Sequence, residues 1–491
     1  MYPSKQSFLV LGLSKSGCAA AEFLLSKGAE TYIYDDVTSV RVEQNFQSLA
    51  EKGAKRVEKE TLSQTAERCD VLVLSPGIPI DHPLAVSFKR HGKAVVGETE
   101  IAARNMRCPI VAITGTNGKT TTVSLIAQAL QAGGTEAYAC GNIGTPLIEY
   151  CGLNDNAVAV AEISSFQLET LNSLCPHVAV VLNITEDHLN RHYNMENYTF
   201  LKAKLLKNCS ESEYVVLNYD DRTVRAFAEK TKAKVLWFSV RERVQGAYYE
   251  NGFLYFGEEK IMPINELFAA GLHNVQNALA TVAVAKIMGI KNPQIVKTLQ
   301  EFKGIKHRLE KIGEVDGVTY IDDSKGTNVD ATVHAIQATK GETLLLLGGK
   351  NKGYDYTKLF ETVKKSNVVH AVLYGENRYE LLKCARAQGF ENLTICTTFS
   401  LAVRLSSILA KKGQTVLLSP ASASFDEFAS YEERGDRFVE IVRTFAEAAA
   451  EKENREAVNV PVDERSDERE KDEYPDGGLA NDERFEYGQT E

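Results

Sequence analysis

Short, largely apolar runs alternate with helix-length segments along most of the chain, and each run ends in glycine or polar residues. In the first hundred residues, the runs Phe8–Leu13, Thr31–Tyr34 and Asp70–Leu74 predict strands, and Cys18–Lys27 predicts a helix. A glycine turn joins the first strand to this helix, and Asp35 follows the second strand. The order of strand, glycine turn, helix, strand and acidic residue predicts a Rossmann-like βαβ unit.

The same alternation predicts two further α/β units. The second begins with a strand at Pro109–Ile113 and a helix at Thr121–Gln131, and strands and helices alternate from there to about residue 300. The third unit contains four more strands, at Val318–Ile321, Thr343–Leu347, Val368–Leu373 and Thr415–Leu418. Alternating strands and helices favour mostly parallel sheets with right-handed crossovers. We therefore expect three α/β domains, at residues 1–96, 97–302 and 303–450.

Composition is that of a globular protein, with 44% hydrophobic and 25% charged residues among 491. No apolar run is long enough to span a membrane, and the N-terminus lacks a signal-peptide layout. The nine cysteines are scattered without a CxxC pair, which is typical of reduced thiols in a cytoplasmic protein.

Charge is concentrated at the end of the chain. Residues 451–491 hold 15 Asp/Glu and 6 Lys/Arg, so they carry nearly all of the net charge of −10. Few apolar residues accompany these charges, and we expect a disordered acidic tail. The nearly neutral remainder argues against a nucleic-acid-binding surface.

The sharpest local signal is TGTNGKT at residues 114–120. Its position between an apolar strand and a helix is typical of a phosphate-binding loop, in which backbone N–H groups and the helix N-terminus face the phosphates. Lys119 would neutralise the β- and γ-phosphates, and the Thr120 hydroxyl would bind Mg²⁺. The loop is a variant, because Ile113 stands at the first glycine position of the usual pattern. It predicts binding of a nucleoside triphosphate such as ATP, but motors, switches, kinases and ligases all use such a loop, so it does not predict the reaction.

The glycine turn GLSKSG at residues 12–17 is a weaker signal, because it lacks the full GxGxxG spacing. It favours a nucleotide other than NAD at the strand ends. NAD binding and a turn that only tightens packing remain alternatives.

Two more polar segments follow predicted strands of the second unit. Glu162 begins EISSFQL (162–168), and His188 lies in NITEDHL (183–189). Carboxyl ends of parallel strands meet at one edge of the sheet, where the phosphate loop also lies. Glu162 and His188 are therefore candidate metal ligands, and a structural histidine is the alternative for His188.

These motifs and others in the same order resemble the Mur ligase superfamily. The resemblance covers about 450 residues and includes SPGI (75–78), GNIGTP (141–146), LHNVQNALA (272–280), HRLE (307–310), DDSKGTN (322–328), GGKNKG (348–353) and SPASASFDEF (419–428). It implies a Rossmann-like N-terminal domain, a central P-loop ATPase-type α/β domain and a C-terminal Rossmann-like α/β domain.

SPGI, SSFQL and SPASASFDEF favour the branch that adds D-glutamate. The resemblance implies an ATP-dependent ligase that joins D-glutamate to UDP-N-acetylmuramoyl-L-alanine through an acyl phosphate, in cytoplasmic peptidoglycan precursor synthesis. It implies small-molecule substrates, a monomer, and neither nucleic acid nor membrane as a partner. Folylpolyglutamate synthase, another member of the superfamily, remains an alternative, and so does a P-loop switch or motor.

The resemblance also implies roles for individual residues. Lys119, Glu162, His188 and Lys202 would be catalytic. ATP would contact Gly115, Thr116, Asn117, Gly118, Lys119, Thr120, Thr121, Asn274, Asn277, Arg308, Asp323 and Lys325. The UDP substrate would contact Ser14, Lys15, Ser16, Gly17, Asp35, Ser75, Pro76, Gly77 and Asn142. D-glutamate would contact His307, Thr327, Lys352, Ser424 and Tyr431.

Two Mg²⁺ ions are implied as cofactors, with Thr120, Glu162, His188 and Lys202 as ligands. Lys202 would bind metal only as a CO₂-derived carbamate, since an ammonium is no metal ligand. Lys202 fits the Tyr-x-x-x-Lys spacing from Tyr198, and Lys204 is the nearby competitor. Because the implied substrate ligands of the third domain lie on a different domain from the phosphate loop, turnover would require that domain to close over the centre.

Overall fold

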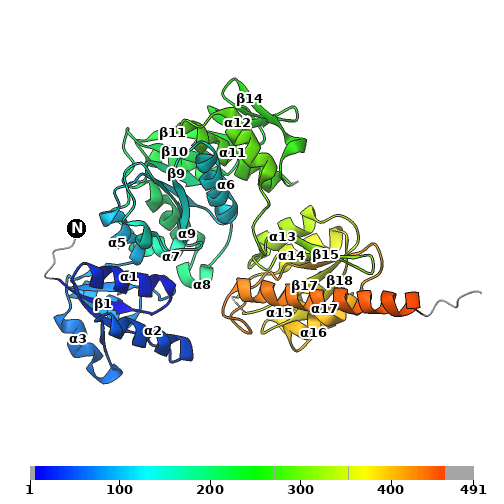
Figure 1. Cartoon of the computed structure of the whole chain (residues 1–491), viewed down its shortest axis with the longest axis horizontal. Coiled ribbons are helices and arrows are strands. Elements are labelled where there is room, and N and C mark those ends of the chain that lie inside the picture. Colours follow the sequence, from blue (N-terminus) through cyan, green and yellow to red (C-terminus); the bar gives the residue numbers. More distant parts are fainter. Residues whose placement is uncertain (1–5, 269–270, 352, 459–491) are drawn as a thin grey trace, which may run out of the picture.

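The computed structural model describes residues 6–268, 271–351 and 353–458. These residues form three α/β units in chain order, each built on its own sheet (Figure 1). Lys352 and residues 459–491, most of the tail expected to be disordered, lie outside the described residues. The final helix continues to Val458 and so includes the first residues of that expected tail.

The first unit is a five-stranded parallel sheet in the order β3-β2-β1-β4-β5. Its strands are β1 (Ser7–Leu11), β2 (Glu30–Tyr34), β3 (Lys55–Arg56), β4 (Val71–Leu74) and β5 (Ala94–Val96). Its helices are α1 (Lys15–Ser26), α2 (Val40–Glu51), α3 (Leu62–Arg68) and α4 (Pro83–Arg90). Gly17 lets α1 approach the sheet closely, because a Cβ there would overlap the Gly12 carbonyl oxygen.

The middle unit has nine strands in the order β14-β13-β12-β11-β10-β9-β6-β8-β7. They are β6 (Ile110–Thr114), β7 (Ala137–Gly141), β8 (Val158–Glu162), β9 (Val178–Val181), β10 (Tyr214–Asn218), β11 (Lys234–Ser239), β12 (Gly246–Glu250), β13 (Phe253–Phe256) and β14 (Glu259–Pro263). All pairs from β7 to β12 are parallel, as expected, and β12, β13 and β14 form antiparallel hairpins that we did not predict.

Helices cover this second sheet and connect it to the neighbouring units. They are α5 (Glu98–Asn105), α6 (Lys119–Ala132), α7 (Ser165–Thr170), α8 (Leu189–His192), α9 (Met195–Ala203), α10 (Arg222–Arg225), α11 (Leu272–Ile287) and α12 (Asn292–Glu301). The central strand β6 is fully buried, and α6 and α11 pack against each other beside it. The phosphate loop therefore lies between the end of a buried strand and the start of a helix that packs against α11.

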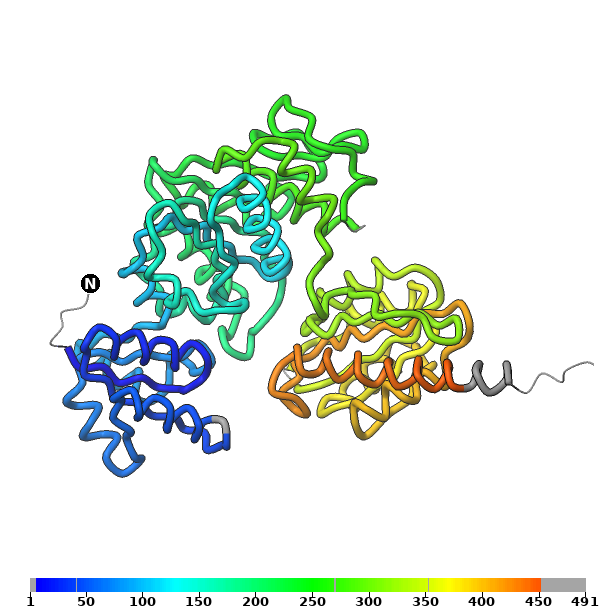
Figure 2. Tube along the Cα trace, in the orientation of Figure 1, coloured from blue at the N-terminus to red at the C-terminus, as the bar shows by residue number. Residues whose placement is uncertain are grey.

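The C-terminal unit is a six-stranded sheet in the order β15-β16-β20-β17-β18-β19, parallel except for β15 against β16. Its strands are β15 (Glu310–Val315), β16 (Val318–Asp322), β17 (Thr343–Gly348), β18 (Val368–Tyr374), β19 (Leu393–Ile395) and β20 (Thr415–Leu418). Its helices are α13 (Val329–Ala338), α14 (Thr357–Lys365), α15 (Arg378–Ala387), α16 (Phe399–Leu409) and α17 (Tyr431–Val458). Figure 2 follows the chain from α12 into this unit along one connection.

The mostly parallel three-unit fold predicted from the sequence is confirmed. Among the described residues, no helix combines the length and apolar character needed to cross a membrane.

Candidate active site between the middle and C-terminal units

The phosphate loop opens into a cavity of about 680 Å³ that residues of the middle and C-terminal units line together. Thr116–Thr120, Glu162, His188 and Lys202 contribute from the middle unit. The predicted residues that contribute from the C-terminal unit are Arg308, Asp323, Lys325, Thr327, Ser424 and Tyr431. The structure thus brings most of the residues predicted to act on ATP, metal and D-glutamate to one place.

The phosphate loop takes its shape from two glycines and the start of α6. Gly115 and Gly118 adopt positive φ, at +151° and +86°, which residues with a Cβ rarely adopt. The Lys119 ammonium donates to the carbonyl oxygens of Gly115 and Thr116 at 2.9 and 2.7 Å. Burial lowers the pKa of Lys119. Gly115 and Thr121 belong to the same junction without lining the cavity.

Glu162 lies at the end of β8, where its carboxylate accepts two hydrogen bonds. Thr120 Oγ1 donates at 2.7 Å and Asn142 Nδ2 at 2.8 Å. Burial by itself would raise the pKa of Glu162, but the charges of Lys325 and Lys119 hold it below its usual value. Asn142, predicted to contact the UDP substrate, therefore lies beside the predicted metal ligands.

Lys202 is 1% exposed on α9, directly behind the phosphate loop. Its ammonium donates to the Gly115 carbonyl oxygen at 2.7 Å and approaches Thr114 Oγ1 at 3.3 Å. Burial, followed by the charge of Lys119, holds the pKa of Lys202 well below its usual value. Lys204 instead donates to the carbonyl oxygens of Leu168 and Glu169. Between the two candidate lysines, the structure brings Lys202 to the cavity.

His188 also lines the cavity, at the start of α8, with φ of +56°. Its Nε2 lies 3.4 Å from Asp187 Oδ2, and its ring packs on Phe166 with 4.7 Å between centroids. Glu162, His188 and Lys202 thus come from three different elements and line the same cavity.

On the opposite wall, Lys325 donates to the hydroxyl of Tyr431 at 2.9 Å. Burial lowers the pKa of Lys325 to about 8. Burial likewise raises the pKa of Asp323 to about 7, although its carboxylate accepts from Ser419 Oγ at 2.6 Å. Burial also lowers the pKa of the Arg308 guanidinium.

Of the two asparagines predicted to face the adenine, Asn277 lines the cavity and Asn274 does not. Asn277 accepts from Thr122 Oγ1 at 3.3 Å. Its buried Nδ2 has no hydrogen-bond partner in the part of the chain that the structure describes. This free donor is available to a ligand.

The residues predicted for the UDP substrate gather at the carboxyl ends of β1, β2 and β4, apart from Asn142. Asp35 accepts from the Leu13 N–H at 2.6 Å, and the hydroxyls of Ser14 and Ser75 lie 3.4 Å apart. Lys15 donates to the Gly144 carbonyl oxygen of the middle unit. Ser16 and Gly17 belong to the first turn of α1.

Arg191 ties this region to the middle unit. Its guanidinium donates to the carbonyl oxygens of Pro76, Gly77 and Ile78, and it forms an ion pair with Glu169 at 2.6 Å. No motif marked Arg191 in the sequence, although it follows NITEDHL by only two positions.

Two carboxylates hold the middle and C-terminal units together. Asp187 of the middle unit accepts from Tyr354 Oη at 2.7 Å and from Asn328 Nδ2 at 3.1 Å. Asp330 of the C-terminal unit accepts from Asn117 Nδ2 at 2.9 Å and from Thr185 Oγ1 at 3.2 Å. Neither of these carboxylates, nor Tyr354, was predicted as a functional residue from the sequence.

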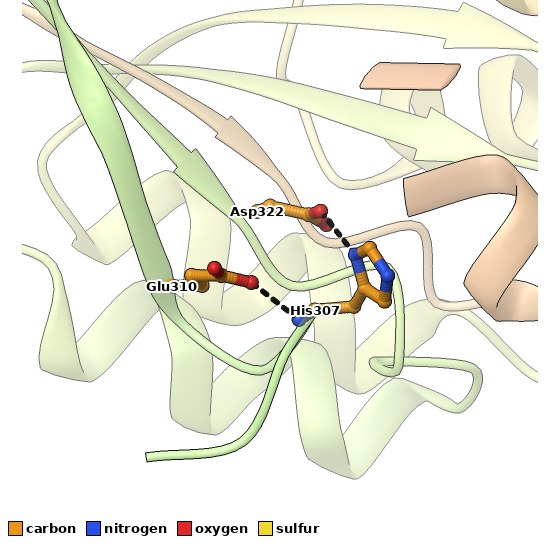
Figure 3. A group of neighbouring side chains, drawn as sticks. All are labelled: His307, Glu310 and Asp322. Carbon is orange, nitrogen blue, oxygen red and sulfur yellow. Dashed lines mark hydrogen bonds and ion pairs between the residues drawn. The ribbon is translucent and has the colours of Figure 1, made fainter. Parts of the chain in front are cut away.

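One predicted D-glutamate contact, His307, is not brought to the cavity. Its imidazole is 2% exposed and hydrogen-bonded to Asp322, with Glu310 beside it (Figure 3). The neighbouring Arg308 lines the cavity instead.

Comparison with known proteins gives a consistent assignment over the three units. Residues 6–97 match the MurD-like N-terminal domain of Mur ligases, residues 113–285 the Mur ligase middle domain, and residues 307–422 the Mur ligase glutamate ligase domain.

Curated relatives and solved structures match over most of the chain. UDP-N-acetylmuramoylalanine–D-glutamate ligase of Koribacter versatilis is 41% identical over 446 residues, covering 89% of this chain and 97% of that protein. The enzyme of the same name from Pelotomaculum thermopropionicum is 42% identical over 459 residues, covering 89% and 98%. The crystal structure of UDP-N-acetylmuramate-alanine ligase MurC from Thermotoga maritima has a TM-score of 0.60 at 17% identity, covering 89% and 99%, and shares the fold.

Proposed function

This chain belongs to the Mur ligase family, and on that premise we propose that it is the ATP-dependent ligase that joins D-glutamate to UDP-N-acetylmuramoyl-L-alanine. One structural observation supports the ligase reaction independently of family membership. The phosphate loop of the middle unit and Lys325, Ser424 and Tyr431 of the C-terminal unit line the same cavity. A ligase needs this arrangement, because ATP and an amino acid must meet at one carboxylate.

The reaction follows from the poor reactivity of a carboxylate as an acyl donor. The alanine carboxylate attacks the γ-phosphorus of ATP, the bond to the bridging oxygen of ADP breaks, and an acyl phosphate forms. The amine of D-glutamate then attacks the acyl carbon and expels phosphate, leaving an amide. Lys119 and the N–H groups at the start of α6 would hold the phosphates in line for the first step.

Lys325 and Arg308 would face the γ-phosphate from the C-terminal unit, and Asn277 would donate its free Nδ2–H to the adenine. Thr327, Ser424 and Tyr431 would receive D-glutamate. Ser14–Gly17, Asp35 and Ser75–Gly77 would bind the uridine nucleotide at the strand ends of the first unit.

The residues around Glu162 fit magnesium. Thr120 and Glu162 offer a hydroxyl and a carboxylate 2.7 Å apart, and such oxygen ligands suit Mg²⁺. His188 and Lys202 would hold a second ion if Lys202 is a carbamate. Two observations support a carbamate. Lys202 is buried, and among the described residues its ammonium donates hydrogen bonds only to the Gly115 carbonyl oxygen and Thr114 Oγ1, with no carboxylate in an ion pair. Bound magnesium would screen the repulsion between the substrate carboxylate and the γ-phosphate.

We further propose that the enzyme acts as a monomer and works in the cytoplasm, where ATP and UDP-linked substrates are found. The test is product formation. The purified chain, given ATP, Mg²⁺, UDP-N-acetylmuramoyl-L-alanine and D-glutamate, should yield a product heavier by one glutamate residue in mass spectrometry. L-glutamate is the matched control and should not be incorporated. No product with D-glutamate, or extension of a folate instead, would refute the proposal.

A further inference from the structure

A buried histidine–aspartate pair lies behind the C-terminal wall of the cavity. His307 Nδ1 and Asp322 Oδ2 are 2.7 Å apart, and the two side chains are 2% and 0% exposed (Figure 3). The second carboxylate oxygen of Asp322 accepts from the Ser324 N–H at 2.8 Å. Asp322 therefore links His307, which lies on the segment that enters from the middle unit, to the loop that follows β16.

The backbone of His307 makes two more contacts in the same place. Its N–H donates to Glu310 Oε2 at 2.7 Å, and its carbonyl oxygen accepts from the Lys325 N–H at 3.0 Å. Its φ of +63° lies in the left-handed region, which a residue with a Cβ adopts only when its surroundings hold it there.

Three cavity residues are attached directly to this pair. Arg308 follows His307 in the chain, Asp323 follows Asp322, and Lys325 is bonded through its N–H to the His307 carbonyl. Displacing the imidazole would therefore move a guanidinium, a carboxylate and an ammonium together.

Helix α17 packs against the His307 ring. A Cβ at Gly435 would overlap the His307 ring, so the ring lies directly against the helix backbone. One turn earlier on that helix is Tyr431, whose hydroxyl accepts from Lys325. Asp436 approaches His307 Nε2 at 3.6 Å and is 58% exposed.

We propose that His307 and Asp322 are positioning residues, which fix Arg308, Asp323 and Lys325 against the cavity without touching a substrate. The proposal rests on the ligase function. It differs from a direct D-glutamate contact, because the ring faces Asp322 and α17 and not the cavity.

The test compares Asp322→Asn with Asp436→Asn in the ligase assay. Both replace a carboxylate beside the same imidazole, but only Asp322 connects it to the cavity residues. Asp322→Asn should lower kcat by about ten- to a hundredfold, in the range that misplacement by about 1 Å produces. Its KM for UDP-N-acetylmuramoyl-L-alanine should stay within about twofold, because the first unit is untouched. Asp436→Asn should leave all constants near wild type.

A second variant displaces the His307 ring without changing either residue of the pair. Gly435→Ala pushes on the ring and should reproduce the loss of kcat with the same unchanged KM, which keeps the test informative if Asp322→Asn does not fold. Wild-type kcat in both folded variants overturns the proposal, as does a rise in the KM for D-glutamate alone, which would indicate a direct contact. A wild-type enzyme without ligase activity would refute the proposed function instead.

Discussion

Replacing Tyr354 with phenylalanine removes one hydroxyl from the contact between the middle and C-terminal units. In this structure the hydroxyl donates to Asp187 Oδ1 at 2.7 Å, and the two residues are 167 positions apart in the sequence. The ring packs on Tyr356 with centroids 6.3 Å apart, and phenylalanine keeps that packing. The substitution therefore removes the hydroxyl that bonds to Asp187 and keeps the packing of the ring.

The magnitude follows from the charge of the acceptor. A hydrogen bond to a charged group contributes about 1.5–3 kcal/mol, more than a neutral one. Opening the units breaks this bond, so its loss should lower the ratio of closed to open molecules by about 10- to 150-fold. Because the proposed D-glutamate contacts lie in the cavity between the units, kcat/KM for D-glutamate should fall by up to the same factor. The KM for the UDP substrate should change little.

Small-angle X-ray scattering of the ligand-free protein measures the closed fraction, and steady-state kinetics measures kcat/KM for D-glutamate. Tyr356→Phe is the matched control. The Tyr356 hydroxyl accepts from Asn377 Nδ2 at 2.6 Å within the C-terminal unit, so its loss breaks no bond between units. An unchanged closed fraction in Tyr354→Phe, or an equal change in Tyr356→Phe, would refute the reasoning.

Four further predictions concern single residues. Lys202→Ala should lose most phosphate release, and high acetate should partly restore it by replacing the proposed carbamate, whereas Lys204→Ala should stay near wild type; the opposite pattern would show that Lys204 is the functional lysine. Lys119→Ala should abolish turnover without shifting the melting temperature, and a variant with near-normal turnover would contradict the phosphate-loop assignment. Burial raises the pKa of Glu98 from 4.5 to about 7, so the folded protein keeps a proton that the unfolded chain releases, and stability falls as pH rises through that window. From about pH 5 to about pH 7.5, the free energy of unfolding measured in urea should fall by about 2 kcal/mol through this group, and Glu98→Gln should lack that fall; an equal fall in both proteins would contradict it. Arg191→Ala should raise the KM for the UDP substrate by about tenfold, the loss of about 1.4 kcal/mol, with the KM for ATP unchanged; equal rises in both would show general damage.

The parallel strands were predictable because each is a buried apolar run between polar turns. The strand at Thr415–Leu418 matches its predicted bounds at both ends. The hairpin of β12 and β13 was missed, although Asn251-Gly252 between aromatic residues is a strong hairpin signal. Asn251 and Gly252 both have positive φ, at +48° and +84°, as such a turn requires.

The candidate site was predictable where a local motif carries the chemistry, as for Lys119 and Glu162. Contacts across the units were not, because nothing local relates Asp187 to Tyr354. The sequence also did not predict which way adjacent polar side chains point. His307 and Arg308 are adjacent and both polar, and only the folded backbone decides that Arg308 lines the cavity while His307 is buried behind it.

Phosphate release measured with each substrate omitted in turn tests the ligase account most directly. With ATP and Mg²⁺ present, release should be fast only when UDP-N-acetylmuramoyl-L-alanine and D-glutamate are both supplied, because the first provides the carboxylate and the second consumes the acyl phosphate. Equal ATP turnover in the absence of either substrate would contradict the account and indicate a P-loop ATPase of another kind.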